Sequence, residues 1–329
     1  MAGIFLNIPF GLIEDRMNMK RVLQVVLLFY AGLALLYPQA HGFLPLLLLS
    51  VGRGLASSFL WLTSWAFIFT YTDKAVKGKE TGFFSDMNDL ASALSPMVGG
   101  LVSILSFFLP FYILSLTSFS AFIVVSVRLK ETPKPQNASL KLQIAKLSGY
   151  LHERKFQKTV VLIIVFYALI NIYYSFFSVF LHDGGISIPL IGVILTVALL
   201  PAVSLEVPMG HLMDSRGIRK TLSLAVVLTT LTALMIPLSS NFYYTVVLVT
   251  AFTVSYTMIF IALYSRMSDI MGQDKVAMTG AIATFKDLGY TIGPLFAGAL
   301  IGAISIRSTF FLAGGAFILL LPIALLLHD

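Results

Sequence analysis

The sequence contains no cysteine, and only 11% of its 329 residues are charged, with 22 Lys/Arg and 15 Asp/Glu. The absence of cysteine excludes a disulfide scaffold and thiolate metal sites. A soluble domain carries about 25% charged residues, whereas this chain is 58% hydrophobic and has a mean hydropathy of +0.92. So few polar side chains cannot cover a water-facing surface. This excludes a soluble enzyme, a disordered chain and, despite the net charge of +7, a nucleic-acid binder. The composition predicts a protein surrounded by lipid.

Long apolar runs recur along the chain, at lengths near the about 20 residues that a membrane-spanning helix needs. They predict an all-α membrane protein with ten full spans, at about Val22–Tyr37, Phe43–Tyr71, Thr81–Phe108, Leu109–Val127, Thr159–Leu181, Ile188–Gly210, Thr221–Pro237, Phe242–Tyr264, Thr279–Ala303 and Thr309–Leu327. The opening residues 1–11 are apolar but reach only half the necessary length. They form either a re-entrant segment or the second half of a helix whose start is missing.

The basic residues give the orientation of these spans. They concentrate in alternate loops, whereas the other set of connections contains Arg307 alone. The positive-inside rule therefore predicts that the basic loops are cytoplasmic. The longest polar stretch, residues 129–157, is rich in lysine and is predicted to be a basic cytoplasmic linker. It divides the chain into an N-terminal transmembrane half, residues 1–128, and a C-terminal transmembrane half, residues 158–329.

The two halves repeat each other. Segments Asn7–Asp15 and Glu206–Asp214 share Pro, Gly and Asp at an offset of 199. Further equivalent positions are Lys20 and Arg21 with Arg219 and Lys220, and, at an offset of 198, Asp89, Pro96 and Gly100 with Asp287, Pro294 and Gly298. The C-terminal half contains a whole additional span before its copy of this segment. We therefore expect that the N-terminal half lacks about 40 residues before Met1, which would form one span and the beginning of the next. With these residues restored, the protein would have six spans in each half.

These elements resemble the major facilitator superfamily of secondary transporters. Its signature G-x-L-A-D-R-x-G-R-K is similar to the sequences that begin at Gly11 and Gly210, and its exporter element G-P-x-x-G-G is similar to Ser95–Gly100 and Gly293–Gly298. The resemblance covers the whole chain and implies alternating access with a gate between the halves. Expected gating residues are Gly11, Asp15, Arg16, Lys20, Asp89, Pro96, Gly100, Gly210, Asp214, Arg219, Lys220, Asp287 and Pro294. The alternatives are charges that only set topology and small residues that only pack.

The glycines and the proline of these motifs also have expected effects on helix geometry. Gly11 and Gly210 are expected to end helices at the cytoplasmic face, because a residue without Cβ allows a tight turn. Pro96 and Gly100 are expected to bend their span and to let helices approach closely. Whether this affects coupling or only close helix contact stays open at this point.

Ionisable residues inside spans are energetically unfavourable and are therefore functional candidates. Arg53 lies ten residues after Phe43, about 15 Å along its helix at 1.5 Å per residue. It is expected to line the central cavity; the alternative is a buried donor between helices. The resembled family has an Arg in an R-x-x-Q-G pattern linked to proton coupling, but here only the Arg matches. Glu206 can carry a proton or form a gate salt bridge with Arg219 or Lys220.

The span at Thr159–Leu181 has one polar-aromatic face. It carries residues that recur at steps of three and four along the helix, namely Asn171, Tyr174, Ser175 and Ser178. Transporters of the resembled architecture bind substrates near the membrane midplane. We therefore expect Arg53, Asn171, Tyr174 and Glu206 to serve substrate binding or coupling.

The sequence therefore predicts a monomeric secondary transporter, not an enzyme, in a prokaryotic plasma membrane. It is expected to export a small amphipathic solute, either a drug-like compound or a sugar, by exchange for protons. No cofactor, metal or nucleic acid is expected, and the chain has no G-x-x-x-x-G-K-[ST] motif for an ATP motor. The alternatives are uptake of an anionic metabolite paired with Arg53, and a transport-inactive membrane protein or fragment.

Overall fold

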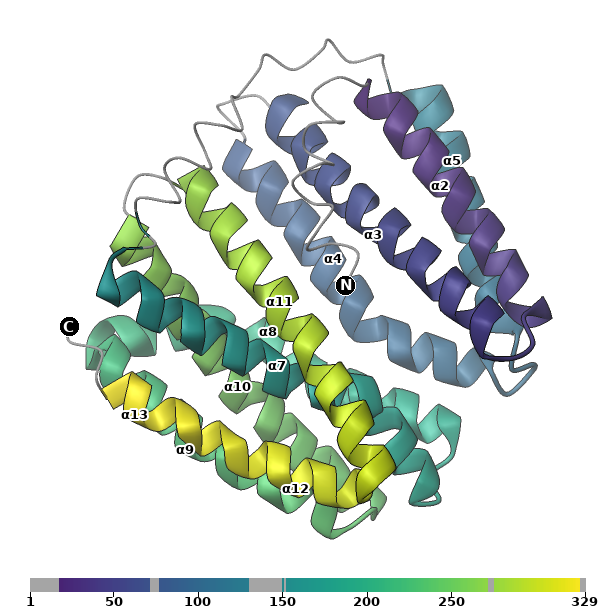
Figure 1. The fold of residues 1–329 in the computed structure, drawn as a ribbon. Coiled ribbons are helices and arrows are strands. Elements are labelled where there is room, and N and C mark those ends of the chain that lie inside the picture. Colours follow the sequence, from purple (N-terminus) through teal and green to yellow (C-terminus); the bar gives the residue numbers. More distant parts are fainter. Residues whose placement is uncertain (1–17, 72–76, 130–149, 151, 272–274, 326–329) are drawn as a thin grey trace. The chain divides into compact units, whose positions relative to one another are not determined.

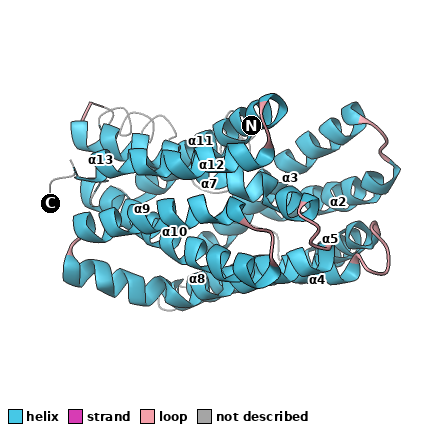
Figure 2. Cartoon of the chain, turned by 90° about the horizontal axis from the view of Figure 1, so that it is seen from below, coloured by secondary structure: helices cyan, strands magenta, loops and turns pink. Residues whose placement is uncertain are grey.

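The computed structural model describes residues 18–71, 77–129, 150, 152–271 and 275–325, and all regular structure within these ranges is helical (Figures 1 and 2). The long helices are α2 (Met19–Leu36), α3 (Phe43–Tyr71), α4 (Lys77–Val102), α5 (Leu109–Arg128), α7 (Arg154–Asp183), α8 (Ile188–Arg216), α9 (Ile218–Met235), α10 (Phe242–Met271) and α11 (Lys275–Ala303). The shorter helices are η1 (Tyr37–Gln39), η2 (Ile236–Leu238), α12 (Ile306–Ala316), η3 (Phe317–Leu319) and α13 (Leu320–Leu325).

The predicted apolar runs fall on helices, the last one on α12, η3 and α13 as far as Leu325, which confirms the all-α membrane fold. The run Thr81–Phe108 was predicted too long, because α4 ends at Val102 and turns follow it. Within the described residues, six helices are long and apolar enough to cross a membrane, namely α2 with η1, α3, α5, α7, α9 with η2, and α10. Helices α4, α8 and α11 differ because they contain charged turns, prolines and many small residues, which lower hydropathy without shortening the helix.

The helix ends reproduce the repeat seen in the sequence. Both ends of α2 lie 199 residues before the corresponding ends of α9, and the same holds for η1 and η2. The start of α3 likewise lies 199 residues before the start of α10. The turns that precede α2 and α9 are also equivalent, because Asn18 corresponds to Gly217. Asn18 caps α2 by accepting a 3.0 Å hydrogen bond from the amide of Lys20, whereas Gly217 joins α8 to α9 with a φ of +84°. A left-handed backbone of this kind favours glycine.

The described helices form two compact units. The first comprises α2, α3, α5 and the part of α4 up to Asp89. The second comprises the segment Leu90–Leu101 of α4 together with the helices from α7 onward. The predicted linker at 129–157 lies mostly outside the described residues, so the division into two halves and a linker stays a prediction.

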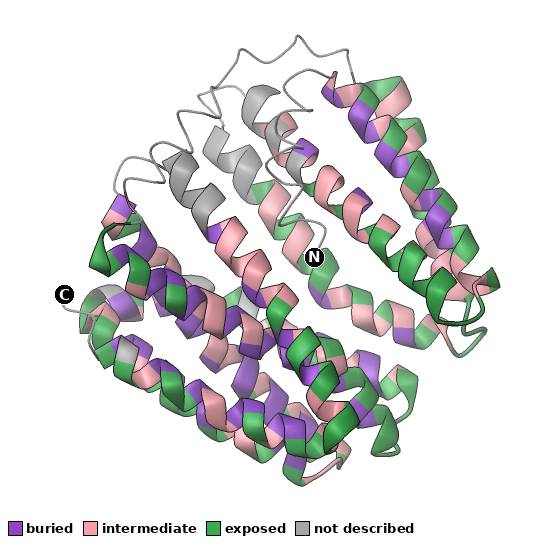
Figure 3. Cartoon of the chain, viewed as in Figure 1, coloured by how far each residue is buried: buried purple, intermediate pink, exposed green. Residues whose placement is uncertain are grey.

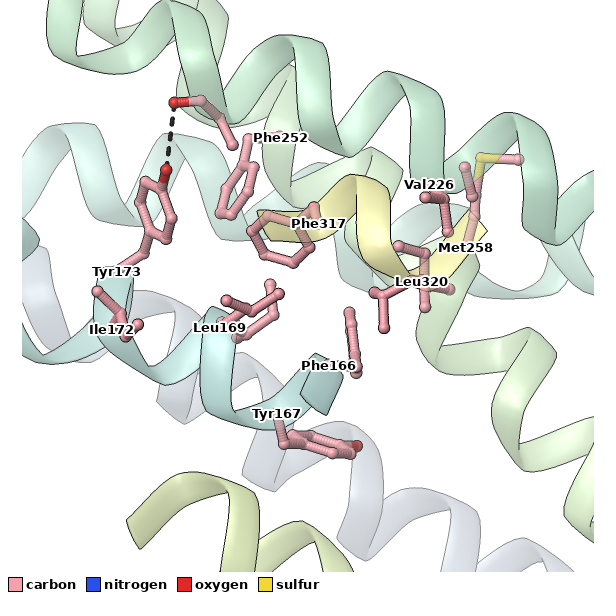
Figure 4. Packing of buried hydrophobic residues seen from close by; sticks show 14 of the residues in the cluster. Phe166, Tyr167, Leu169, Ile172, Tyr173, Val226, Phe252, Met258, Phe317 and Leu320 are labelled. Carbon is pink, nitrogen blue, oxygen red and sulfur yellow. Dashed lines mark hydrogen bonds between the residues drawn. The ribbon is translucent and has the colours of Figure 1, made fainter. Parts of the chain in front are cut away.

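The second unit has a continuous apolar core. Buried residues of α7 and α10 meet those of α9 and the last helices, among them Phe310 and Phe317. Figure 3 shows buried positions along these helices, and Figure 4 shows Phe317 next to Phe252. Tyr173 of α7 is fixed there: its hydroxyl lies 2.9 Å from the carbonyl oxygen of Phe310 and 3.2 Å from that of Ala233, and it donates its single proton to this pair of acceptors. This unit can therefore hold side chains of α7 and α10 in defined positions.

In the first unit, α2 packs against α3 and α5, with a small core around Val22, Val26 and Ala56. The side-chain amide of Gln24 donates a 2.9 Å hydrogen bond to the hydroxyl of Ser126 on α5. Many large apolar side chains of α3 and α5 are exposed, as expected for helices that face lipid.

Candidate functional site

A cavity of about 310 Å³ lies within the second unit. Its walls come from α4, α7, α8, η2 and α10, and the lining residues are Ser92, Pro96, Tyr173, Tyr174, Phe177, Leu195, Ala198, Leu199, Ile236, Val249, Phe252, Thr253 and Tyr256. This volume is at the small end of the range typical of drug-sized ligand sites. The described lining residues include no Asp, Glu, Lys, Arg or His, so the cavity is uncharged within the part of the chain that is described.

The wall formed by α4 and α8 is an unusually close helix crossing. A Cβ placed on Gly192 of α8 would fall on the carbonyl oxygen of Pro96, and one on Gly100 of α4 would come within 3.0 Å of the carbonyl oxygen of Ile188. The hydroxyl of Thr196 accepts a 3.1 Å hydrogen bond from the amide of Met97. The two glycines permit α4 and α8 to approach closely. The Thr196 side chain can therefore reach the α4 backbone at Met97, directly after Pro96.

Pro96 also explains a local contact on α4. A proline inside a helix leaves the carbonyl four residues earlier without its amide donor, and here that carbonyl belongs to Ser92. The hydroxyl of Ser95 donates a 3.2 Å hydrogen bond to it. Both Ser92 and Pro96 line the cavity, so the interruption of the helical hydrogen bonds lies at the cavity wall.

The part of the wall that α7 and α10 form is aromatic. Tyr173 and Phe252 lie with ring centroids 4.9 Å apart, and Phe252 meets Tyr256 edge to face at 5.5 Å. Tyr174 and Tyr256 are hydrogen-bonded through their hydroxyls, with their rings 6.2 Å apart and inclined by 68°. Tyr174 is 49% exposed, so part of its ring remains open to a ligand.

Four expected substrate or coupling residues have separate locations. Tyr174 lines the cavity. Asn171 is half-buried and donates a 2.6 Å hydrogen bond to the carbonyl oxygen of Tyr290 on α11. Arg53 is exposed on α3 in the first unit and is not among the lining residues, and its alternative role as a buried donor stays a prediction. Glu206 lies on α8, and its side chain is outside the described residues. A central location for Arg53 stays a prediction.

The expected gating residues around Gly210 need one correction. Gly210 does not end its helix, because α8 continues to Arg216 and the turn occurs at Gly217. A Cβ placed on Gly210 would have no neighbouring atom within 4 Å, and no turn at this position requires a residue without a side chain. Asp214 also lies in α8, with its side chain outside the described residues. Of the first copy, Gly11, Asp15 and Arg16 lie outside the described residues.

The remaining gating candidates are distributed over four helices. Arg219 and Lys220 are exposed in the first turn of α9, and Lys20 is half-buried in the first turn of α2. Asp89 and Asp287 are half-buried, and the side-chain amide of Asn88 donates a 3.3 Å hydrogen bond to the carboxylate of Asp89. Of the two prolines, Pro96 lines the cavity and Pro294 interrupts α11, while Gly100 takes part in the α4–α8 crossing. Their gating roles stay predictions.

Tyr256 and Thr196 were not among the residues predicted from the sequence. Tyr256 lies in a hydroxyl-rich stretch of α10 with Thr253, Ser255 and Thr257, whereas Thr196 is the single hydroxyl in the apolar first half of α8. A hydroxyl inside a span needs a partner away from water, and this signal could have selected Thr196; among the many hydroxyls of α10 it does not single out Tyr256.

Comparison with known proteins agrees with this architecture. A curated relative, the quinolone resistance protein NorA of Staphylococcus aureus (strain MSSA476), is 23% identical over 300 residues, covering 89% of this chain and 76% of the relative. Multidrug resistance protein 2 of Bacillus subtilis (strain 168) is 22% identical over 310 residues, covering 91% and 77%.

A solved structure with the same fold is a bacterial homologue of the human lysosomal transporter Spinster, in an inward-facing and unoccupied conformation. It has a TM-score of 0.74 and 13% sequence identity, and the match covers 98% of this chain and 86% of that chain. The family model described as Major Facilitator Superfamily matches residues 1–183 and 159–329. The chain therefore belongs to the major facilitator superfamily, a family of multi-pass membrane transporters and not of enzymes.

Proposed function

We propose that this transporter exports small, largely apolar aromatic compounds across a bacterial cell membrane, and that the cavity of the second unit binds them. The observation that carries the proposal is the cavity lining, which combines aromatic and aliphatic side chains with few hydroxyl groups. Apolar walls with a small number of positioned polar groups are typical of sites for drug-like ligands. The names of the two curated relatives, which refer to quinolone and multidrug resistance, support the same substrate class.

We further propose that export is driven by proton exchange in a monomer that works by alternating access. A proton that moves across 100 mV releases about 2.3 kcal/mol, which is enough to concentrate a solute. Candidate groups are Asp89 and Asp287, which are half-buried within α4 and α11, and Arg53, an exposed charge in an apolar helix. Charged residues inside spans mark ion or substrate pathways by default.

Uptake of an anionic metabolite is the second candidate. It needs a cation at the binding site, and none of the described residues that line this cavity is a cation. A sugar would need many hydrogen-bonding groups, whereas the described lining offers a few hydroxyls. Both alternatives are therefore less well supported than an aromatic solute.

The experiment uses inverted membrane vesicles with the full chain, energised to an inside-acidic proton gradient. A panel of neutral, cationic and anionic aromatic fluorophores is tested with and without an uncoupler, against vesicles without the protein. The expected result is uptake of at least one neutral or weakly basic compound that the uncoupler abolishes. Uptake that persists in the uncoupler would contradict proton exchange. No transport of any compound would favour the transport-inactive alternative.

A further inference from the structure

The aromatic wall of the cavity presents a hydroxyl pair to a ligand, formed by Tyr174 and Tyr256. The other tyrosine on the wall, Tyr173, has its hydroxyl occupied by the carbonyl oxygens of Phe310 and Ala233 and offers only its ring. In the Tyr174–Tyr256 pair one hydroxyl donates to the other. Two hydroxyls carry two protons, so one O–H group of the pair remains for a ligand acceptor.

The two rings are arranged so that a flat ligand can use this donor. They are inclined by 68°, with Phe252 edge to face against Tyr256. Tyr174 is 49% exposed, whereas Phe252 is 4% exposed and supports Tyr256 from the core. A planar ring that stacks on the open face of Tyr174 has its edge near the hydroxyl pair. Offset-stacked and edge-to-face contacts are the preferred arrangements of aromatic rings.

The same cavity disfavours an organic cation. The faces of Tyr rings attract cations, but a cation taken out of water needs a counter-charge or several acceptors. No carboxylate is among the described lining residues, and the hydroxyl of Thr253 and the exposed Ser92 are the other side-chain oxygens on the wall. An uncharged ligand avoids this penalty and can still accept the hydrogen bond.

We propose that the Tyr174–Tyr256 hydroxyl pair is the specificity-determining element of the cavity, and that it selects uncharged planar aromatic compounds with a carbonyl-type acceptor over aromatic cations of the same shape. This rests on the proposed function and deepens it, because it names the ligand class and the two side chains that recognise it.

A matched ligand pair tests the proposal without any mutation. N-methylacridone is uncharged and carries a carbonyl acceptor, whereas N-methylacridinium has the same three rings, a positive charge and no acceptor. Binding to the full chain in lipid nanodiscs is measured by equilibrium dialysis, with empty nanodiscs subtracted for partition into lipid. We expect N-methylacridone to bind at least tenfold more tightly. Equal or tighter binding of N-methylacridinium overturns the proposed selectivity.

Hydroxyl removal then tests the two residues. In the double variant Tyr174→Phe/Tyr256→Phe, we expect the affinity for N-methylacridone to fall about three- to tenfold, as for loss of one hydrogen bond, while the affinity for N-methylacridinium stays within twofold. Each single variant keeps one hydroxyl with its proton, so its loss should be smaller than that of the double variant. Tyr243→Phe is the control: Tyr243 lies on the same helix as Tyr256, is 78% exposed and is not a lining residue.

The outcomes separate this inference from the proposed function. If the wild-type protein transports panel compounds but the tyrosine variants bind N-methylacridone as tightly as wild type, the hydroxyl pair is not the recognition element and the export proposal stands. An equal loss for both acridine ligands would show that the hydroxyls only shape the cavity, and would also overturn the inference. A third outcome is that the wild-type protein transports other neutral compounds but does not bind N-methylacridone. This result contradicts the proposed ligand class and leaves the export proposal standing.

Discussion

The side-chain amide of Asn171 on α7 donates a 2.6 Å hydrogen bond to the carbonyl oxygen of Tyr290 on α11. Tyr290 lies four residues before Pro294, so its carbonyl is the one that the proline leaves without a helical amide donor. Asn171 therefore satisfies, from a neighbouring helix, a backbone group that α11 cannot satisfy by itself. An unpaired carbonyl among apolar side chains would be costly, and this contact removes that penalty.

This pairing predicts the effect of Asn171→Leu on stability. The variant leaves the Tyr290 carbonyl without a donor, and we expect the free energy of unfolding in detergent to fall by about 1–3 kcal/mol. In a Pro294→Ala background the amide of residue 294 returns to that carbonyl, so the same Asn171→Leu change should destabilise by less. A double-mutant cycle in denaturant measures the difference. Equal losses in both backgrounds would contradict the account.

The α7–α11 contact predicts a large effect at Gly293. A Cβ at this position would fall on the carbonyl oxygen of Ala168, which is backbone and cannot rotate away. We expect Gly293→Ala to destabilise the protein by about 1–3 kcal/mol through overpacking. Gly302→Ala is the matched control on the same helix, because nothing lies within 4 Å of its Cβ position. Thermal unfolding of the two purified variants tests this, and similar melting temperatures would contradict the close contact.

The α4–α8 crossing predicts that Thr196 supports transport through the wall of the cavity. Thr196→Val keeps the shape of the side chain but removes the acceptor for the amide of Met97, whereas Thr196→Ser keeps the acceptor. We expect Val to lower the rate of vesicle uptake about two- to tenfold, as expected for one lost hydrogen bond, and Ser to retain near wild-type uptake. If Ser and Val behaved alike, the hydrogen bond would not be the relevant contact.

Arg53 gives a prediction about coupling. Its side chain is an exposed charge within a 29-residue helix that is otherwise largely apolar. If Arg53 serves coupling, Arg53→Gln should reduce proton-driven uptake at least tenfold, while exchange of labelled for unlabelled solute without a gradient should change much less. Arg307→Gln is the control, since Arg307 is also exposed but lies in the first turn of α12. Equal losses of both activities would mean that Arg53 has a structural role.

Much of the fold could be predicted because lipid imposes a simple rule on sequence. A span must be long and apolar, so the runs that begin at Phe43, Leu109, Ile188 and Phe242 give helix starts that the structure reproduces. The 199-residue repeat likewise appears in the helix ends. The end of α8 was predicted wrongly, because one glycine inside a helix costs only about 1 kcal/mol and does not by itself end the helix.

The site was predicted less well, because a polar residue in a span does not reveal its partner. Asn171 and Tyr174 share one face of α7, yet one contacts the α11 backbone and the other lines the cavity with Tyr256. Pro294 alone would have predicted that the Tyr290 carbonyl needs a donor from outside its helix. Which helix supplies that donor follows only from how α7 packs against α11.

The most direct test of the account is to fill the cavity and measure proton-driven uptake into inverted vesicles. Leu199→Trp adds bulk at a lining residue of α8, whereas Val197→Trp adds the same bulk at an exposed position of the same helix that does not line the cavity. With both variants present in the membrane at wild-type levels, we predict that Leu199→Trp abolishes uptake of neutral aromatic compounds and Val197→Trp does not. Full uptake by Leu199→Trp would contradict the claim that this cavity carries the substrate.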